Sequence, residues 1–314
     1  MHEPIVTMTF NPALDTSTSI DHVVPEQKLR CNPPRHEPGG GGVNVARAIH
    51  RLGGEAQAIY TLGEPFGALL QRLLEEEGVN QIPIPIERLT RESFVVLDET
   101  SGQQYRFSVP GPKLTEKEWE CCFDTLRNLD PTPTYIVASG SLTPGAPRDG
   151  YARLARLARE LGSRFILDSS GEELCHAVEE GVFLLKPNMR ELKHLAGEEI
   201  ESEEQQEEVV QELIKSGKAE VVVVSLGAAG ALFATAEEMS RIRAPTVHIQ
   251  SKIGAGDSTV GGITLALARG LSLREAAYFG VAAGSAAVMT PGTELCRRED
   301  TERLYNKMQG EIND

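Results

Sequence analysis

Cysteines, positive charges and long apolar runs are all scarce in this sequence of 314 residues, and each shortage excludes a class of protein. The five cysteines are scattered and form no C-x-x-C pair: Cys31, Cys121, Cys122, Cys175 and Cys296. We therefore expect neither a disulfide framework nor a zinc site, but a reduced cytoplasmic chain whose cysteines are small buried hydrophobic residues. We expect neither a secretory leader nor a membrane span, because residues 1–10 lack a basic start followed by a long apolar run and no apolar run approaches membrane-spanning length.

Positive charges are outnumbered, since 31 Lys and Arg face 46 Asp and Glu and the net charge is −15. The resulting field repels nucleic acid, so no nucleic-acid partner is expected. It also repels phosphorylated metabolites, so a phosphate site must be built locally from backbone N–H groups, a few cations or a metal. The candidate cations are Lys28, Arg30, Arg35 and His36 within nine residues, and Arg91 further on. Of these, Arg35 is most simply a surface cation.

Four common catalytic signatures are absent. Gly217-Lys218 is followed by Ala219, so the chain has no G-x-x-x-x-G-K-[ST] loop. The glycine pairs 40/42 and 254/256 lack the third glycine of G-x-G-x-x-G, and neither G-x-S-x-G nor H-E-x-x-H occurs. These absences argue against P-loop kinases, dinucleotide dehydrogenases, serine hydrolases and zinc proteases.

From residue 135 onward, short apolar strands alternate with amphipathic helices. We predict helices over 151–161 and 203–216, and strands over 135–139, 165–168, 183–186 and 221–225. Such strands are typical of a parallel sheet covered on both faces, so the predicted class is α/β with a doubly wound, mostly parallel sheet. Two helices rich in alanine and glycine, 257–269 and 273–289, are predicted to close the chain.

The first third of the chain follows a different pattern. A core strand over 4–10 and helices over 44–53 and 66–77 are predicted, separated by two irregular stretches. Both stretches are expected to form short antiparallel strands outside the parallel sheet and to make a small, discontinuous β-lid. The predicted domains are an α/β core over 1–14, 38–81 and 113–314 and a lid over 15–37 and 82–112.

The strongest local signal is Gly-Ala-Gly-Asp-Ser at 254–258, which opens a helix. The free N–H groups and the dipole of a helix N-terminus favour a phosphate, and small residues let it approach. Asp257 in the same turn would take the proton of an attacking hydroxyl, as phosphoryl transfer requires. A plain helix start explains the motif equally well, because Gly followed by Asp-Ser is good capping chemistry.

Three further signals are weaker. Four consecutive glycines, 39–42, precede Asn44 and indicate very close approach by a ligand, since ordering them in a loop costs entropy. Asn188 and Glu191 follow a predicted strand at a spacing that suits either magnesium or a capping box, and the cap is favoured. The small residues 225–230 suit either a nucleotide or a tight turn into the segment 231–234.

Taken together and in this order, these motifs resemble those of the PfkB group of ribokinase-like sugar kinases over essentially the whole chain. More narrowly, the sequence is similar to the minor-isozyme type of bacterial 6-phosphofructokinase. The segments that carry the likeness are NPALD (11–15), QKLRC (27–31), EPGGGGVNVARAI (37–49), YRFSVPG (105–111), SGSLTPG (139–145), LDSSGE (167–172), KPN (186–188), VVVSLG (222–227), the glycine-rich 254–262 and FGVAAGSAA (279–287).

The resemblance implies a ribokinase-like fold and specific roles. Asp257 would be the catalytic base, with an anion hole formed by the turn Gly254, Ala255, Gly256 and Asp257. Sugar hydroxyls would be held by Asp15, Gly40, Gly41, Gly42, Asn44 and Ser141. The phosphate of the sugar would meet Lys28, Arg30 and Arg91, with Arg91 a candidate for donation by a neighbouring subunit.

The remaining implied roles concern ATP, metal ions and assembly. ATP would be bound by Lys186, Asn188, Ser225, Leu226, Gly227, Ala228, Ala229, Gly230, His248 and Ser285. Glu191 would position Mg²⁺ through water. A monovalent cation such as K⁺ would lie near Ser251, Ile253, Ala287, Thr290 and Gly292, and two chains would pair through their lids.

The acceptor sugar is the open point. Relatives that act on fructose 1-phosphate or tagatose 6-phosphate commonly have a lysine where this chain has Gly41, and Lys28 is the natural substitute for that lysine. We therefore expect ATP-dependent, glycolytic phosphorylation of fructose 6-phosphate at its 1-hydroxyl, with the other two sugar phosphates as alternatives. A non-catalytic sensor of nucleotide or sugar phosphate is the alternative of a different class, which retention of Asp257 disfavours.

Overall fold

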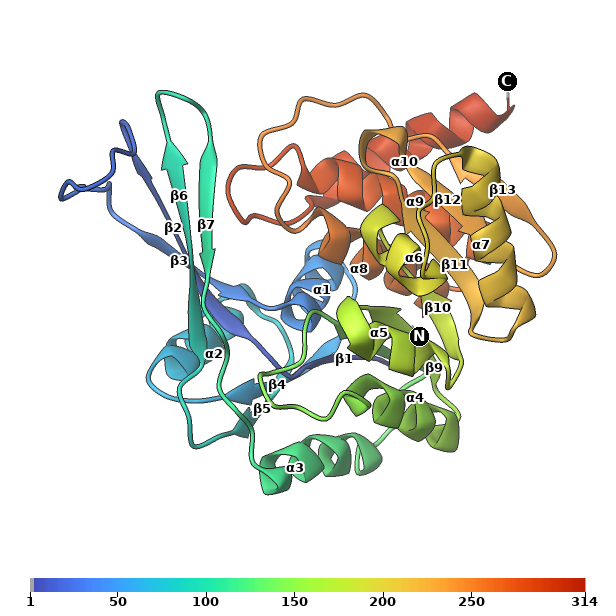
Figure 1. Cartoon of the computed structure of the whole chain (residues 1–314), viewed down its shortest axis with the longest axis horizontal. Coiled ribbons are helices and arrows are strands. Elements are labelled where there is room, and N and C mark those ends of the chain that lie inside the picture. Colours follow the sequence, from blue (N-terminus) through green and yellow to red (C-terminus); the bar gives the residue numbers. More distant parts are fainter. Residues whose placement is uncertain (1–2, 314) are drawn as a thin grey trace.

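The computed structural model describes residues 3–313 and contains two sheets (Figure 1). The large sheet has nine strands in the order β13-β12-β11-β10-β9-β8-β1-β4-β5. All neighbouring strands from β5 to β11 pair in parallel, whereas β12 pairs antiparallel with both β11 and β13. Its strands are β1 (Ile5–Thr9), β4 (Gln57–Leu62), β5 (Gln81–Pro85), β8 (Tyr135–Ser139), β9 (Arg164–Asp168), β10 (Val182–Leu185), β11 (Ala219–Ser225), β12 (Ala231–Ala234) and β13 (Met239–Ile242).

Both faces of this sheet are covered by helices, which is why its central strands are apolar throughout. All five residues of β1 and of β8 are buried. Alternate residues enter opposite cores: Val137 packs with the first cluster, whereas Ile136 packs with the second. One face carries α1 (Gly41–Arg51), α2 (Phe66–Glu77), α8 (Ala255–Ala268), α9 (Leu273–Ala287) and α10 (Arg298–Asn313). The other carries α3 (Glu116–Arg127), α4 (Gly150–Leu161), α5 (Gly171–Val178), α6 (Met189–Ala196) and α7 (Glu203–Lys215). The predicted doubly wound α/β class is confirmed.

The second sheet stands away from the large one at the left of Figure 1. Its order is β3-β2-β6-β7, with bounds β2 (Ala13–Ile20), β3 (Arg35–Gly39), β6 (Arg91–Asp98) and β7 (Gln104–Ser108). The expectation that all its strands are antiparallel is wrong, because β2 pairs with β6 in parallel. In the chain, β2 follows β1 and β6 follows β5. Because β1 and β5 run in the same direction, β2 and β6 enter the second sheet in the same direction and pair in parallel.

Residues 81–85 also depart from the expectation that segment 82–112 lies outside the parallel sheet. They form β5, which pairs in parallel with β4. Pro83 and Pro85 obscured this strand, but β5 is an edge strand, where a residue without an N–H group is tolerated on the open side. The division into core and lid domains stays a prediction.

Two further expectations need correction. The chain does not close with α8 and α9, since α10 follows and packs against α9 through an edge-to-face contact of Tyr305 with Phe279. Helix α10 was not predicted because its buried apolar residues, among them Leu304 and Met308, are few and lie in a segment rich in charged residues. Among the free cysteines, Cys31 and Cys121 are exposed rather than buried. Within residues 3–313, no helix is long and apolar enough to cross a bilayer.

Candidate active site

A cavity of about 240 Å³ lies where the carboxyl ends of the parallel strands face the second sheet. It brings together seven residues that were predicted from the sequence and come from distant segments. These are Asp15, Gly40, Asn44, Arg91, Ile253, Gly254 and Asp257. The cavity is also lined by residues that were not predicted, among them Arg106, Lys252 and Thr293.

The start of α8 decides between the two interpretations of residues 254–258. Gly254 takes φ 76°, a left-handed conformation, and a Cβ there would lie 2.6 Å from Leu295 Cδ2. No described side chain caps this helix, and Ser258 Oγ instead accepts a hydrogen bond from the Cys296 N–H at 3.3 Å. The first N–H groups of α8 are therefore left without a side-chain acceptor. The anion-site interpretation is favoured over plain capping.

Asp257 is held by donors from two other elements. Asn44 Nδ2 donates to Oδ2 at 3.0 Å, and Ser139 Oγ donates to Oδ1 at 3.1 Å. Burial, together with the negative charge of Asp168, raises the pKa of Asp257 to about 6, although the two hydrogen bonds and Lys186 act in the opposite direction. A carboxylate with such a pKa is suited to accept a proton near neutral pH.

Asp168 and Ser139 are site residues that the predictions missed. Asp168 Oδ1 lies 3.1 Å from Lys186 Nζ, and this Lys186 is almost fully buried. Each missed residue is the last residue of a parallel strand, β9 and β8 respectively. That position was the available signal, because ligands of α/β sheets bind at the carboxyl ends of strands.

The glycines at 39–42 pack tightly, but mainly against the protein itself. A Cβ on Gly41 would lie 2.4 Å from Ser139 Oγ, and one on Gly42 would lie 2.5 Å from Thr9 Oγ1. Gly40, with φ 108°, lines the cavity, whereas Gly42 is buried beneath it. The close backbone approach that these glycines predicted is thus made by β1 and β8, against which the first turn of α1 packs, and their contact with a ligand stays a prediction.

Arg91 lies in the cavity of its own chain, close to Asp15. Its Nη1 donates to Ser108 Oγ at 3.0 Å and its Nη2 to the Asn11 carbonyl at 3.3 Å, while its buried Nε lacks a partner among the described residues. Burial lowers the pKa of Arg91 and raises that of Asp15 to about 6, and each charge partly offsets the shift of the other. Asp15 and Arg91 therefore influence the charge of each other, and both line the cavity that a polar ligand would enter.

The other predicted phosphate cations are placed differently. Lys28 and Arg30 lie in the exposed connection between β2 and β3, outside the residues that line the cavity. Arg106 on β7, in contrast, lines the cavity, and the substitution of Lys28 for a lysine at position 41 stays a prediction. Arg35 is exposed and contacts Glu37, as expected for a surface cation. Ser141 is exposed and accepts a hydrogen bond from Asn11 Nδ2 at 3.1 Å.

Asn188 and Glu191 form the capping box that was favoured for them. Asn188 Oδ1 accepts from the Glu191 N–H at 3.0 Å, and Glu191 Oε2 accepts from the Asn188 N–H at 2.8 Å. Glu191 Oε1 remains available, and the pKa of Glu191 is raised by burial and by the charge of Asp168. The same residues line a second cavity of about 870 Å³, together with Ser170 and Gly171. A hard oxygen donor beside open space fits a hydrated divalent cation.

The segment 225–230 is a tight turn, which was one of its two interpretations. Gly230 takes φ 102°, and a Cβ there would lie 1.9 Å from the Ile242 carbonyl oxygen, so only glycine fits. The short helix η1 (Gly227–Ala229) is exposed next to it, and Ser225 forms a bridge with Asn188. His248 is exposed in the loop after β13, and Ser285 is buried on α9. An exposed turn beside Asn188 is compatible with a nucleotide.

The residues expected near a monovalent cation converge from two loops. Ser251 Oγ donates to the Gly292 carbonyl at 2.6 Å, and its oxygen accepts from the Ile253 N–H at 3.2 Å. Thr290 Oγ1 donates to the Ala287 carbonyl at 2.7 Å. The group therefore offers neutral carbonyl and hydroxyl oxygens immediately before α8, which are suitable ligands for such an ion.

Comparison with known proteins places this geometry in a family. The model of the pfkB family of carbohydrate kinases matches residues 8–300. The chain belongs to this family. It is 48% identical to the ATP-dependent 6-phosphofructokinase isozyme 2 of Mycobacterium tuberculosis over 96% of this chain and 88% of that protein. Its identity to the isozyme 2 of Escherichia coli is 44%, over 96% of this pfkB chain and 97% of the relative.

Solved structures agree with the fold of this pfkB-family chain. Phosphofructokinase-2 from Escherichia coli in complex with potassium has a TM-score of 0.95 and 43% identity, covering 98% of this chain and 99% of that one. The same enzyme has been solved with fructose-6-phosphate and in a tetrameric inhibited form. Ribokinase from Arabidopsis thaliana, at 22% identity and a TM-score of 0.76 over 97% and 99% of the two chains, shares the fold. The expected ribokinase-like fold and PfkB membership are confirmed.

Proposed function

We propose that this chain transfers the γ-phosphoryl group of ATP to the 1-hydroxyl of fructose 6-phosphate, giving fructose 1,6-bisphosphate and ADP. The observation that carries the proposal is the Asp257 carboxylate, held by Asn44 and Ser139 in the same cavity as Arg91. The cavity thus combines a proton acceptor, free helix N–H groups and a cation. The 6-phosphofructokinase activity of the two relatives supports this acceptor.

Asp257 acts as the general base in this proposal. It takes the proton of the sugar hydroxyl as that oxygen attacks phosphorus in line and the bond to ADP breaks. The N–H groups of Ala255, Gly256 and Asp257 stabilise the charge that spreads over the phosphoryl oxygens, since their helix dipole favours anions. Gly254 lets the turn form without a side chain in the path. Closure of the second sheet over the cavity would exclude water.

The sugar phosphate contacts the second sheet. Asp15 and Asn44 accept and donate hydrogen bonds to the hydroxyl groups, with the backbone of Gly40, Gly41 and Gly42 and the Ser141 hydroxyl beside them. Arg91 binds the phosphate, because a guanidinium makes charge-assisted, bidentate contacts with phosphate oxygens. Arg106 lines the same cavity and is the second cation of this site. Lys28 and Arg30 stay predictions for this role.

The nucleotide lies on the other side of Asp257. Lys186, Asn188, His248, Ser285 and the turn 225–230 surround it. Glu191, through water, would hold a Mg²⁺ ion that neutralises charge on the triphosphate. The oxygens around Ser251 and Thr290 would hold K⁺ next to the helix start, as the potassium complex of the Escherichia coli enzyme suggests.

The acceptor is tested by comparing kcat/KM for fructose 6-phosphate, tagatose 6-phosphate and fructose 1-phosphate with Mg·ATP. We expect the highest value for fructose 6-phosphate, because the two relatives that match almost the whole chain are 6-phosphofructokinases. Removal of Mg²⁺ by a chelator should abolish ADP release, and K⁺ should increase it. A higher value for another sugar changes the acceptor alone, whereas no ADP release with any sugar would favour a non-catalytic sensor.

The base is tested by Asp257→Asn. We expect kcat to fall by about 100- to 10,000-fold, which is the usual contribution of general-base catalysis, while binding of sugar phosphate changes little. In the wild-type protein, kcat should fall about tenfold per pH unit below about pH 6, because the protonated Asp257 is no longer an acceptor.

The control for this profile is Asp15→Asn, because Asp15 titrates in the same range. This variant should raise KM but keep the acid limb of kcat. Saturating substrates are needed, since phosphate groups also ionise near pH 6. A kcat for Asp257→Asn near that of the wild type would remove Asp257 from the role of base.

The phosphate site is tested by Arg91→Ala. We expect KM for the sugar phosphate to rise by roughly 10- to 100-fold with a smaller effect on kcat, because a hydrogen bond to a charged group is lost. The matched control is Arg88→Ala, since Arg88 is exposed and lies outside the cavity-lining residues. An unchanged KM in the folded Arg91→Ala variant would contradict the assignment.

The second sheet is also proposed to join two chains into a homodimer. Phe94 and Phe107 are cross-strand partners on β6 and β7 and expose 38% and 55% of their surface, and Val109 is 42% exposed. Light scattering at several concentrations should give the mass of at least two chains. Phe107→Asp should reduce that mass, whereas Leu89→Asp, at an equally exposed residue outside the sheet, should not. A monomeric wild-type protein would contradict the proposal.

A further inference from the structure

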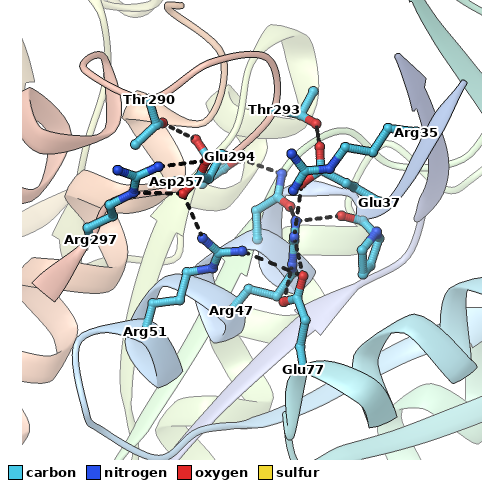
Figure 2. Close-up of polar contacts among 12 residues, drawn as sticks. Arg35, Glu37, Arg47, Arg51, Glu77, Asp257, Thr290, Thr293, Glu294 and Arg297 are labelled. Atoms are coloured by element: carbon cyan, nitrogen blue, oxygen red, sulfur yellow. Dashed lines mark hydrogen bonds and ion pairs between the residues drawn. The ribbon is translucent and has the colours of Figure 1, made fainter. Parts of the chain in front are cut away.

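Arg47 on α1 is a buried cation to which the proposed reaction assigns no role. Its exposed fraction is 1%, the lowest of any cation named in this site. Figure 2 shows it between Glu77 and the region of Asp257, within a group of charged residues that joins α1, α2, β3 and the loop before α10. A buried guanidinium needs hydrogen-bond acceptors for its N–H groups, so the acceptors of Arg47 identify the groups that it holds in place.

Four of the five N–H groups of Arg47 donate hydrogen bonds, and these go to three residues. Nε and Nη2 donate to the two carboxylate oxygens of Glu77 at 2.7 and 2.6 Å, a bidentate pair. Nη1 donates to the Pro38 carbonyl at 2.7 Å and to Asn44 Oδ1 at 3.2 Å. Glu77 anchors one side of the guanidinium, so that the other side faces Asn44.

The chemistry of these groups fixes the orientation of the Asn44 amide. A guanidinium has only donors, so the amide must turn its oxygen toward Arg47. Its NH₂ group then faces Asp257 Oδ2 at 3.0 Å, where an ionised carboxylate accepts. Without Arg47, the amide is free to rotate by 180° and present its oxygen to Asp257. Two acceptors would then face each other unless the carboxyl carried a proton.

We propose that Arg47 is a positioning residue for phosphoryl transfer, because its contact with Asn44 keeps the amide NH₂ directed at Asp257 and thereby keeps Asp257 a proton acceptor. This inference rests on the proposed role of Asp257 as the base. Arg47 itself touches neither the reacting atoms nor the cavity-lining residues other than Asn44. Because Asn44 also binds sugar hydroxyls in the proposed function, and the charge of Arg47 also lowers the pKa of Asp15, KM for the sugar will change as well. The decisive effect is therefore on the titration of Asp257, which is seen in kcat at saturating substrates.

Other charges also act on Asp257 and have to stay constant in the test. Those that face it or share its cavity are Asp168 at the end of β9, Lys186 after β10, Asp15 on β2, Arg91 on β6, Arg106 on β7 and Lys252 before α8. Those around Arg47 are Glu77 on α2, Glu37 and Arg35 on β3, and His50 and Arg51 on α1. None of them is changed in the decisive variant, Arg47→Gln.

Arg51 provides a matched control. It lies one turn further along α1 and also contacts Glu77, at 3.7 Å, and Glu294, at 3.7 Å. Asn44 forms its hydrogen bonds with Asp257, Arg47 and the backbone, and Arg51 is not among these partners. Arg51→Gln therefore removes the same charge from the same cluster and leaves the amide fixed. A further variant is Glu77→Gln, which weakens the anchor of the guanidinium but leaves Nη1 present as a donor to Asn44.

The experiment measures kcat against pH at saturating substrates for the wild type, Arg47→Gln, Arg47→Lys, Arg51→Gln and Glu77→Gln. We expect the acid limb of both Arg47 variants to move up by about one pH unit, so that kcat at pH 6 falls several-fold more than kcat at pH 8. Arg47→Lys separates orientation from charge, because it keeps the charge but loses the planar fork. Arg51→Gln should keep the wild-type limb, and Glu77→Gln should shift the limb less than the Arg47 variants do, because its guanidinium is held less firmly but is still present.

Three outcomes would overturn the proposal. The first is an equal fall of kcat at every pH in Arg47→Gln, which is the result of a purely structural role. The second is a wild-type limb in Arg47→Lys, which would show that charge alone matters. The third is a shift of equal size in Arg51→Gln. If Arg47→Gln does not fold by circular dichroism, the profile of Arg47→Lys decides alone. Asp257→Asn separates failure of the base assignment from failure of this inference. If Asp257→Asn retains turnover, the base assignment fails. If it is inactive and the acid limb of the folded Arg47 variants does not move, only this inference fails.

Discussion

The structure depends on keeping one carboxylate ionised where burial opposes it. Asp257 lies in the first turn of α8, and both desolvation and the charge of Asp168 favour its protonated form. Three groups act against this: the Asn44 amide, the Ser139 hydroxyl and the Lys186 ammonium. These groups come from α1, β8 and the end of β10, which are far apart in the sequence, so the fold of the large sheet must bring them together around Asp257. A doubly wound parallel sheet does so, because its strands all end at the same edge.

The second sheet adds cations to the cavity that contains Asp257. Its parallel pair places Ala13 opposite Arg91 and Asp15 opposite Ser93, so Arg91 and Asp15 lie on the same face two residues apart. Val95 pairs with Arg106 across the β6–β7 hairpin, which adds the second guanidinium to this face. In a chain of net charge −15, an anionic ligand is therefore attracted only at short range, within the cavity where these cations are concentrated.

The parts of this arrangement that follow from local chemistry were predictable, and those that follow from long-range packing were not. β8 and β11 are apolar on both faces, which identifies buried parallel strands in the sequence alone. Asp257 is recognisable because glycine and alanine around it leave space at a helix start. In contrast, Asp168 and Lys186 matter through their mutual distance, which no local pattern contains. The glycines 41 and 42 were predicted to need a ligand because the sequence does not show Ser139 and Thr9 packing against them.

The same limit explains why Arg47 has no signal in the sequence, although it lies inside a recognised motif. Its spacing from Asn44 is that of neighbours on one helix face, which predicts a contact but not its importance. The importance of this contact depends on Glu77, 30 residues away on α2. Its carboxylate offsets the cost of burying the guanidinium and leaves Nη1 directed at Asn44. Glu37 adds a further link, since it accepts a hydrogen bond from Thr293 in the loop before α10. Charged residues that do not line the cavity thus hold the amide of Asn44, which does, and in our proposal the orientation of this amide determines whether Asp257 acts as a base.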